Sequence, residues 1–113
     1  MKIVHSTTEN GIRILAMSGK FIIGPGDSEI RQAIQQSLQA EHTKIVLNLT
    51  HVTTADSSAI GEFIAAFTRL KGQGGNLHLC CLPPKVKDIL TVTGLISTFK
   101  VFSSEEEAVA SFT

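Results

Sequence analysis

The chain has 113 residues, of which ten are basic and ten are acidic, so its formal charge is zero. A chain of this length supports one hydrophobic core, which predicts a single domain over residues 1–113. The balanced charge lacks the basic field that sequence-independent nucleic-acid binding requires, so no nucleic-acid partner is expected. Because the sequence holds no apolar run of about 18 residues, we also expect no direct membrane insertion.

The cysteines indicate a cellular compartment. Cys80 and Cys81 are adjacent in a hydrophobic run, and neighbouring residues on a strand point to opposite faces, which disfavours a disulfide between them. Two thiols without a disulfide framework fit a reducing environment. Residues 1–6 show strand-like alternation rather than an apolar core with a cleavage site, so we expect no secretion signal. We therefore expect a cytoplasmic protein.

The first elements along the chain are two short strands, expected over residues 2–8 and 12–18. They flank Asn10-Gly11, and both of these residues tolerate the positive φ of a type I′ hairpin turn. A loop over residues 19–26 follows, punctuated by three glycines and a proline.

A helix and the most hydrophobic strand of the chain come next. Apolar residues recur at helical spacing from Ile30 to Leu38, which predicts a helix that begins at residue 27 or 28 and ends near residue 40. Residues 44–49 are almost continuously apolar. This pattern is typical of a strand that is covered on both faces, so we expect it at the centre of the sheet.

Helices and strands then alternate to the end of the chain. A second amphipathic helix follows, with its entrance in the stretch 53–61 and an apolar face that begins at Ile60, and it ends at the glycines of 72–75. After it we expect a buried strand over 76–82, a helix opened by Pro83-Pro84 and ended by Gly94, a strand over 98–102, and a helix capped by Ser104 with Glu107. The order ββαβαβαβα predicts an α/β fold, with a mixed sheet of four to five strands and about four helices.

The stretch from Thr53 to Gly61 joins the central strand to its helix. It places Asp56, Ser57 and Ser58 at a helix entrance, at the carboxyl end of a strand, where α/β sheets usually display their chemistry. Asp and Ser are also favoured helix caps, each worth about 1 kcal/mol. On these three residues alone capping is the favoured role, and presentation of a hydroxyl to another protein is the alternative.

Catalytic and metal sites have little support in the sequence. The four histidines are scattered, and Cys80-Cys81 has no second thiol pair to complete a zinc site. Ser58 lacks the glycines of a nucleophile elbow, and no histidine is placed to activate it. Gly24-Pro25-Gly26 lacks the Lys-Ser/Thr ending of a phosphate loop. We therefore expect no enzyme, no bound cofactor and no metal ion.

In combination, several segments resemble a STAS domain, the fold shared by sulfate-transporter tails and bacterial anti-sigma factor antagonists. The matching segments are residues 45–49, 52–61, 74–77, 90–95, 99–102 and 107–108. They extend from about Gly19 to the C-terminus at family-like spacing. The resemblance implies a single-domain, STAS-like mixed sheet.

The resemblance also implies a function. In the family, a phosphorylatable Ser or Thr lies two positions after the Asp, which corresponds to Ser58, with Ser57 as the adjacent alternative. Family members bind a cognate anti-sigma factor, often a serine kinase, while unphosphorylated, and so free a sigma factor. The kinase, which supplies ATP and Mg²⁺, phosphorylates the antagonist and releases it, and a serine phosphatase restores it. The chain is then a substrate and ligand, with no cofactor of its own.

A partner-binding surface is expected around this serine. We assign to it Asp56, Ser57, Ser58, Ala59, Glu62 on the exposed side of the following helix, and Ile23 and Gly24 in the preceding loop. Two positions depart from the family pattern. Ala59 replaces the usual Gly and is small enough to keep the surface accessible. Asn48 replaces a common Asp, which removes a charge near the site and alters what a partner meets.

Two other readings of the same surface remain open. A stand-alone STAS chain also serves as an accessory subunit of a lipid-transport ABC system, where it is a protein-interaction module that is not phosphorylated. The third reading is an enzyme that uses the helix N-terminus as an anion site.

Overall fold

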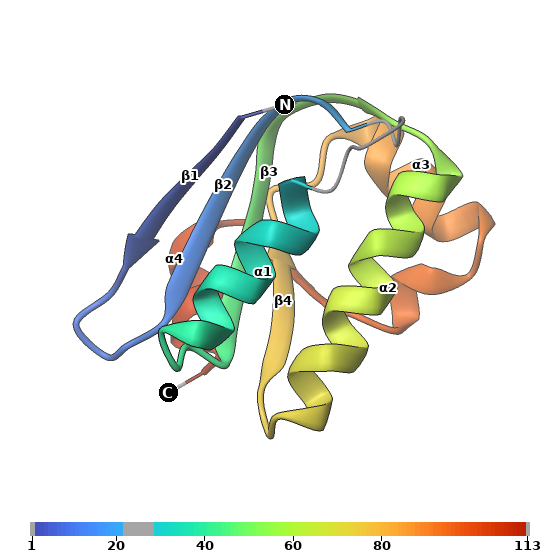
Figure 1. Cartoon of the computed structure of the whole chain (residues 1–113). Coiled ribbons are helices and arrows are strands. Elements are labelled where there is room, and N and C mark those ends of the chain that lie inside the picture. The colour runs from blue at the N-terminus through green and yellow to red at the C-terminus, as the bar shows by residue number, and fades with distance from the viewer. Residues whose placement is uncertain (1, 22–28, 113) are drawn as a thin grey trace.

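A computed structural model of the chain describes residues 2–21 and 29–112, apart from the side chains of residues 21 and 57–59. The elements in order are β1 (Lys2–Thr7), β2 (Arg13–Phe21), α1 (Glu29–Gln39), β3 (Lys44–Ala55), α2 (Ser57–Gly72), β4 (Asn76–Cys80), α3 (Pro84–Val92), a 3₁₀ turn (Leu95–Ser97), β5 (Lys100–Phe102) and α4 (Glu105–Ala110) (Figure 1). The predicted order ββαβαβαβα and the α/β class are confirmed.

The strands form one mixed sheet in the order β1-β2-β3-β4-β5. β1 runs antiparallel to β2, whereas β2, β3, β4 and β5 are all parallel to one another. β3 occupies the centre, and its residues Ile45, Val46 and Leu47 are completely buried. The central position expected from the continuous apolar run is therefore confirmed.

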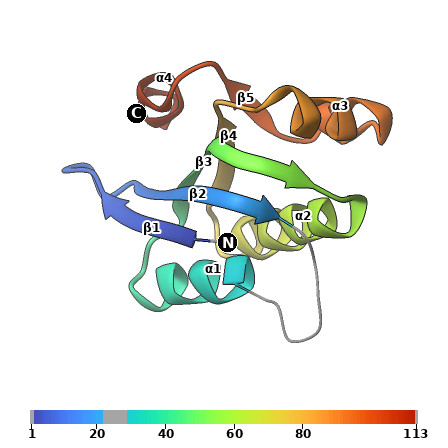
Figure 2. The ribbon, with the colours of Figure 1, turned by 90° about the horizontal axis from the view of Figure 1, so that it is seen from above.

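Helices cover both faces of the sheet. α1 and α2 lie on one face and α4 on the other (Figure 2). Because side chains alternate along a strand, β3 contributes Ile45 and Leu47 to the first face and Val46 to the second. The larger core also takes up residues of α1, α2 and α3, namely Ile30, Ile34, Ile60, Phe63, Leu70, Val86 and Leu90. The smaller core under α4 contains Ile12, Ile14, Cys80 and Ala108.

The β1–β2 hairpin differs from the expected type I′ turn. Gly11 has a φ of 82°, but Asn10 is not among the residues with positive φ. Thr8 N–H donates to the Ile12 carbonyl at 2.9 Å, and Gly11 N–H donates to the Thr8 carbonyl at 3.0 Å. The loop therefore holds three residues and ends in a left-handed glycine. The Thr8 hydroxyl supports this arrangement by accepting from Ile12 N–H at 3.1 Å.

Several element boundaries also differ from expectation. β2 continues to Phe21, into the loop that was expected over residues 19–26. β3 continues to Ala55, six residues past the predicted end at 49, because β2 pairs with it along this extension. β4 ends at Cys80 since Cys81 adopts a φ of 62°, which leaves the extended conformation. The last strand begins at Lys100, after the 3₁₀ turn. Within the described part of the chain, no helix is long and apolar enough to cross a membrane.

Candidate functional site at the amino end of α2

β3 carries the Asp56-Ser57-Ser58 segment beyond its neighbour β4. Pairing between β3 and β4 stops at Asn48, opposite Cys80, whereas pairing between β2 and β3 continues to Phe21 and Ala55. Val52 is 4% exposed and Ala55 is 9% exposed, so the extension is anchored in the core. The segment that follows therefore begins at the carboxyl edge of the sheet, past the last pair of strand residues.

Asp56 lies at the start of α2. Its carbonyl accepts a hydrogen bond of 3.1 Å from Ile60 N–H, which closes the first helical turn and gives Asp56 the N-cap position. Ser57 and Ser58 are the first two residues of the helix, and Ala59 is the third. The next residues on the inner face, Ile60 and Phe63, are completely buried. The turn that carries the serines is thus continuous with a helix fixed in the core.

Glu62 differs from its expected position on the exposed side of α2. Its carboxylate lies 2.7 Å from the Arg31 guanidinium of α1, and its side chain is only 14% exposed. The reason is that α1 packs beside α2, so the edge of α2 that carries Glu62 faces a helix rather than solvent. Sequence reasoning missed Arg31 because 31 residues separate the two positions and no local pattern links them.

The exposed surface of α2 after the first turn carries two small residues. Gly61 and Ala65 are both exposed, and a Cβ atom added to Gly61 meets no atom within 4 Å. A small cavity of about 50 Å³ lies beside Ala65, between the two helices, and Arg31, Glu62 and Arg69 contribute to its lining. This surface therefore combines the small residues Gly61 and Ala65 with a few charged groups.

The remaining predicted site residues fall partly outside the description. Ile23 and Gly24 lie outside the described residues, and so do the side chains of Ser57, Ser58 and Ala59. β2 ends at Phe21, directly opposite Ala55. The chain therefore leaves β2 next to the residue that precedes Asp56.

Asn48 lies away from the helix entrance. It precedes Asp56 by eight positions, a path of roughly 25 Å along an extended strand. Its side chain points to the α4 face of the sheet, where it donates a hydrogen bond of 2.7 Å to Glu105. The expectation that this position alters the charge at the site is therefore wrong. Its role is to join β3 to α4.

Other kinds of site find little support in the described part of the chain. Within residues 2–21 and 29–112, no group of three His, Cys, Asp or Glu side chains lies close enough together to hold a metal ion. Both cysteines are free thiols. Cys80 is completely buried, and burial, followed by a hydrogen bond with Cys81, raises the pKa of its thiol. Because the thiolate is the reactive form, Cys80 is suited to packing rather than to nucleophilic chemistry.

Comparison with known proteins identifies the family. The STAS domain profile matches residues 4–108. The chain belongs to the STAS domain family. The resemblance seen in the sequence segments is therefore confirmed. In this STAS domain the Asp-Ser-Ser segment joins β3 to α2, at the carboxyl ends of the parallel strands.

Relatives of this STAS domain include proteins of known structure. The chain is 29% identical over 101 residues to the anti-sigma F factor antagonist of Paenibacillus polymyxa, which covers 87% of this chain and 84% of that protein. It superimposes on an anti-sigma factor antagonist from Mycobacterium paratuberculosis with a TM-score of 0.84, at 19% identity, over 97% of this chain and 92% of the other. At this identity, the superposition shows a shared fold.

The Bacillus protein SpoIIAA shares the fold as well. Its phosphorylated form gives a TM-score of 0.76 at 19% identity, covering 99% of this STAS domain and 100% of the other chain. Its unphosphorylated form, described as an anti-sigma factor antagonist, gives a TM-score of 0.79 at 20% identity, over 96% and 93% of the two chains. The expected STAS-like mixed sheet of four to five strands is thus confirmed against solved structures, and it has five strands.

Proposed function

We propose that this STAS domain is an anti-sigma factor antagonist that phosphorylation at Ser58 switches off. The observation that carries the proposal is the position of Asp56-Ser57-Ser58, at the amino end of α2 and past the end of β4. The name of the Paenibacillus relative supports the general function. The unphosphorylated chain binds an anti-sigma factor with serine-kinase activity, so that a sigma factor is freed. ATP and Mg²⁺ belong to the kinase, and a serine phosphatase reverses the modification.

The local charges suit such a switch. A phosphoryl group adds about −1.5 to −2 charges at neutral pH, and the amino end of a helix tolerates negative charge. Residue 58 precedes Glu62 by one helical turn, so the two positions share a face of α2. The new charge would lie near Glu62 and its partner Arg31, which are joined at 2.7 Å. Phosphorylation therefore changes the electrostatics of this surface without a change of fold.

A partner that fits the neutral hydroxyl is penalised by the phosphoryl group. Burial of an unpaired charge at an interface costs a few kcal/mol, which weakens binding by roughly a hundredfold or more. In this proposal Asp56 holds the turn, while Ser58, Ala59 and the exposed Gly61 form the centre of the docking surface. Ile23 and Gly24 extend it, because β2 ends opposite Ala55. The chain is a ligand and a substrate of the kinase, acting in the cytoplasm as one domain.

Phosphate mapping tests the modified residue. The protein is incubated with its cognate kinase and ATP, and the phosphorylated residue is identified by mass spectrometry of peptides. We expect phosphate on Ser58, loss of phosphorylation in Ser58→Ala, and full phosphorylation in the matched control Ser57→Ala. The reverse pattern would transfer the assignment to Ser57. Phosphate elsewhere in the chain would overturn the proposed site.

Copurification tests the partner. Unphosphorylated protein is used as bait in a cell extract, with Ser58→Asp as the mimic of the modified form. We expect an anti-sigma factor with kinase activity to bind the first bait at least about a hundredfold more tightly than the second. Recovery of an ABC transporter that binds both baits equally would overturn the antagonist proposal and favour an accessory subunit.

A further inference from the structure

His78 is a buried polar residue on the face of the sheet that α4 covers. Its side chain is only 2% exposed. The imidazole stacks on the Phe112 ring, with centroids 3.9 Å apart and planes inclined by 7°, and it packs against Phe102 at 5.7 Å. Phe112, two residues after α4, and Phe102 in β5 thus hold the imidazole ring in position.

Hydrogen bonds set the tautomer of this ring. Nδ1 lies 2.7 Å from the Ser111 hydroxyl oxygen, and the Ser111 hydroxyl donates its single proton to the Ala108 carbonyl at 2.5 Å. Ser111 is therefore the acceptor, and His78 Nδ1–H is the donor. Nε2 then carries the lone pair. It is buried and has no hydrogen-bond partner among the described residues. A buried acceptor without a donor is costly, which indicates a missing partner at this atom.

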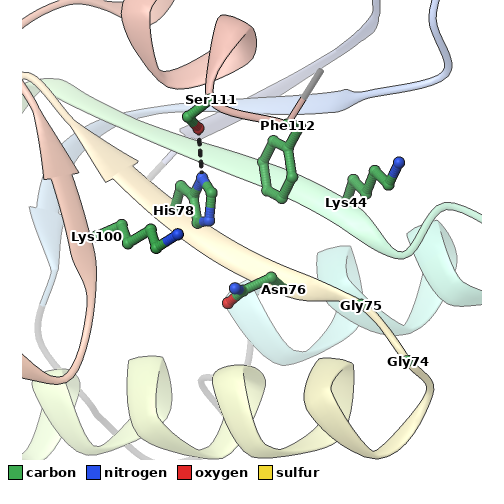
Figure 3. A pocket seen from close by; sticks show the side chains of 8 residues that line it. All are labelled: Lys44, Gly74, Gly75, Asn76, His78, Lys100, Ser111 and Phe112. Atoms are coloured by element: carbon green, nitrogen blue, oxygen red, sulfur yellow. Dashed lines mark hydrogen bonds between the residues drawn. The ribbon is translucent and has the colours of Figure 1, made fainter.

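His78 lines a cavity of about 290 Å³ at the amino ends of the parallel strands (Figure 3). Lys44, the first residue of β3, and Lys100, the first residue of β5, contribute to the same lining, together with Asn76 and Gly75. Among the described residues that line it, none is an aspartate or a glutamate. This cavity lies at the edge of the sheet opposite to Ser58, so it is a separate site and does not depend on the proposed function.

Each feature of the cavity specifies one property of an occupant. The lone pair on His78 Nε2 requires a hydrogen-bond donor, and the ammonium groups of Lys44 and Lys100 favour an anion. We propose that the cavity binds a small oxyanion that carries its own hydroxyl group, of which hydrogen phosphate is the simplest example. The P–OH group donates to His78 Nε2, and the charged oxygens face Lys100, which lies beside His78 on the neighbouring strand (Figure 3). Because Nε2 is covered, entry requires movement of a lining side chain, and both lysines are long and exposed.

A comparison of phosphate with sulfate tests the proposal, because sulfate is similar in size and charge but has no hydroxyl at neutral pH. Titrations of the whole chain are followed by ¹H–¹⁵N NMR at matched ionic strength. We expect phosphate to bind about tenfold more tightly than sulfate, the ratio that one hydrogen bond to a charged group supports. The Nε2 resonance of His78 should shift with phosphate and not with sulfate.

Variants separate the two parts of the site. His78→Phe keeps the stacked ring and removes Nε2, so phosphate and sulfate should then bind equally. Lys100→Gln should weaken both anions about threefold or more, whereas the control Lys85→Gln, at an exposed position on α3, should change neither. Equal binding of the two anions to the unmodified protein would overturn the proposal. Phosphate-induced chemical-shift changes at the amino end of α2 instead of at His78 would also overturn it. This second test uses only the unmodified protein.

Discussion

The amide of Asn48 donates a hydrogen bond of 2.7 Å to the carboxylate of Glu105, although 57 positions separate the two residues. The amide oxygen accepts two further hydrogen bonds from Thr50, from its backbone N–H at 3.0 Å and from its hydroxyl at 2.6 Å. Asn48 therefore joins the central strand to α4 through its amide nitrogen, while its amide oxygen binds Thr50 of the same strand. An aspartate cannot replace it here, because a carboxylate has no proton to donate to Glu105.

We predict that Asn48→Asp destabilises the fold by about 1–3 kcal/mol at neutral pH, because two carboxylates would then face each other in a half-buried site. Urea denaturation measures the change. The double variant Asn48→Asp with Glu105→Gln is the matched control, since its new amide can donate to the new carboxylate. It should recover most of the stability. No recovery would show that the Asn48–Glu105 hydrogen bond is not what position 48 contributes.

Local patterns account for what the sequence predicted correctly. The apolar run at 44–49 identified the central strand, and the spacing of Ser104 and Glu107 identified a capped helix. In the structure, Ser104 accepts from Glu107 N–H at 3.1 Å, and its hydroxyl donates to the Glu107 carboxylate at the same distance. The start of α2 at Asp56 is local in the same sense. Each of these features is decided by residues within one or two turns of chain.

Contacts between distant segments account for what the sequence missed. The burial of Glu62 depends on Arg31, and the pairing of Asn48 depends on Glu105, so neither follows from a local pattern. The extension of β3 to Ala55 has the same origin. Apolar and polar residues alternate little over residues 50–55, which include three threonines. β2 nevertheless pairs with this segment as far as Phe21. Tertiary pairing here overrides a weak local signal.

The buried His78 predicts a characteristic loss of stability in acid. Burial is the main cause that lowers its pKa to about 4, and the positive charge of Lys100 adds to it, with a smaller contribution from Lys71 and an opposing one from the Ala108 carbonyl. An unfolded histidine has a pKa near 6.5. Between pH 6.5 and 4 the unfolded chain therefore binds a proton at His78 that the folded chain does not.

Folding stability should consequently fall as the pH falls through this window, by up to about 3 kcal/mol from this group. The contribution is fully present above pH 6.5. Urea denaturation at a series of pH values gives the slope, and His78→Phe should remove this part of it. The control His51→Gln, at an exposed position of β3, should keep the slope of the unmodified protein. If stability depended on pH equally in His78→Phe and His51→Gln, the assignment of this effect to His78 would be contradicted.

Two glycines should respond to alanine in opposite directions. Gly61 lies inside α2 and has open space where a Cβ would be, so Gly61→Ala should stabilise the protein by about 0.5–1 kcal/mol. At Gly75 a Cβ would collide with the carbonyl oxygen of Thr43. Gly75→Ala should therefore destabilise by about 1–3 kcal/mol. Thermal unfolding of the two variants under the same conditions checks both signs, and a shift in the same direction would contradict the packing described for one of them.

The exposed side of α2 should matter for partner binding but not for folding. Ala65 lies one helical turn after Gly61 on this surface, so Ala65→Arg places a long charged side chain where the proposed partner docks. We predict at least about a tenfold loss of affinity for the anti-sigma factor, with the free energy of unfolding changed by less than about 0.5 kcal/mol.

Ala110→Arg is the matched control for this prediction. It makes the same substitution at an exposed helical alanine, but on α4, at the opposite face of the sheet from α2 (Figure 2). Isothermal titration against the isolated partner should show unchanged affinity for this control. If Ala65→Arg also bound normally, the docking surface would have to lie on the preceding loop and the first turn of α2 alone. If both variants lost affinity to the same extent, the added positive charge, and not its position on α2, would be the cause.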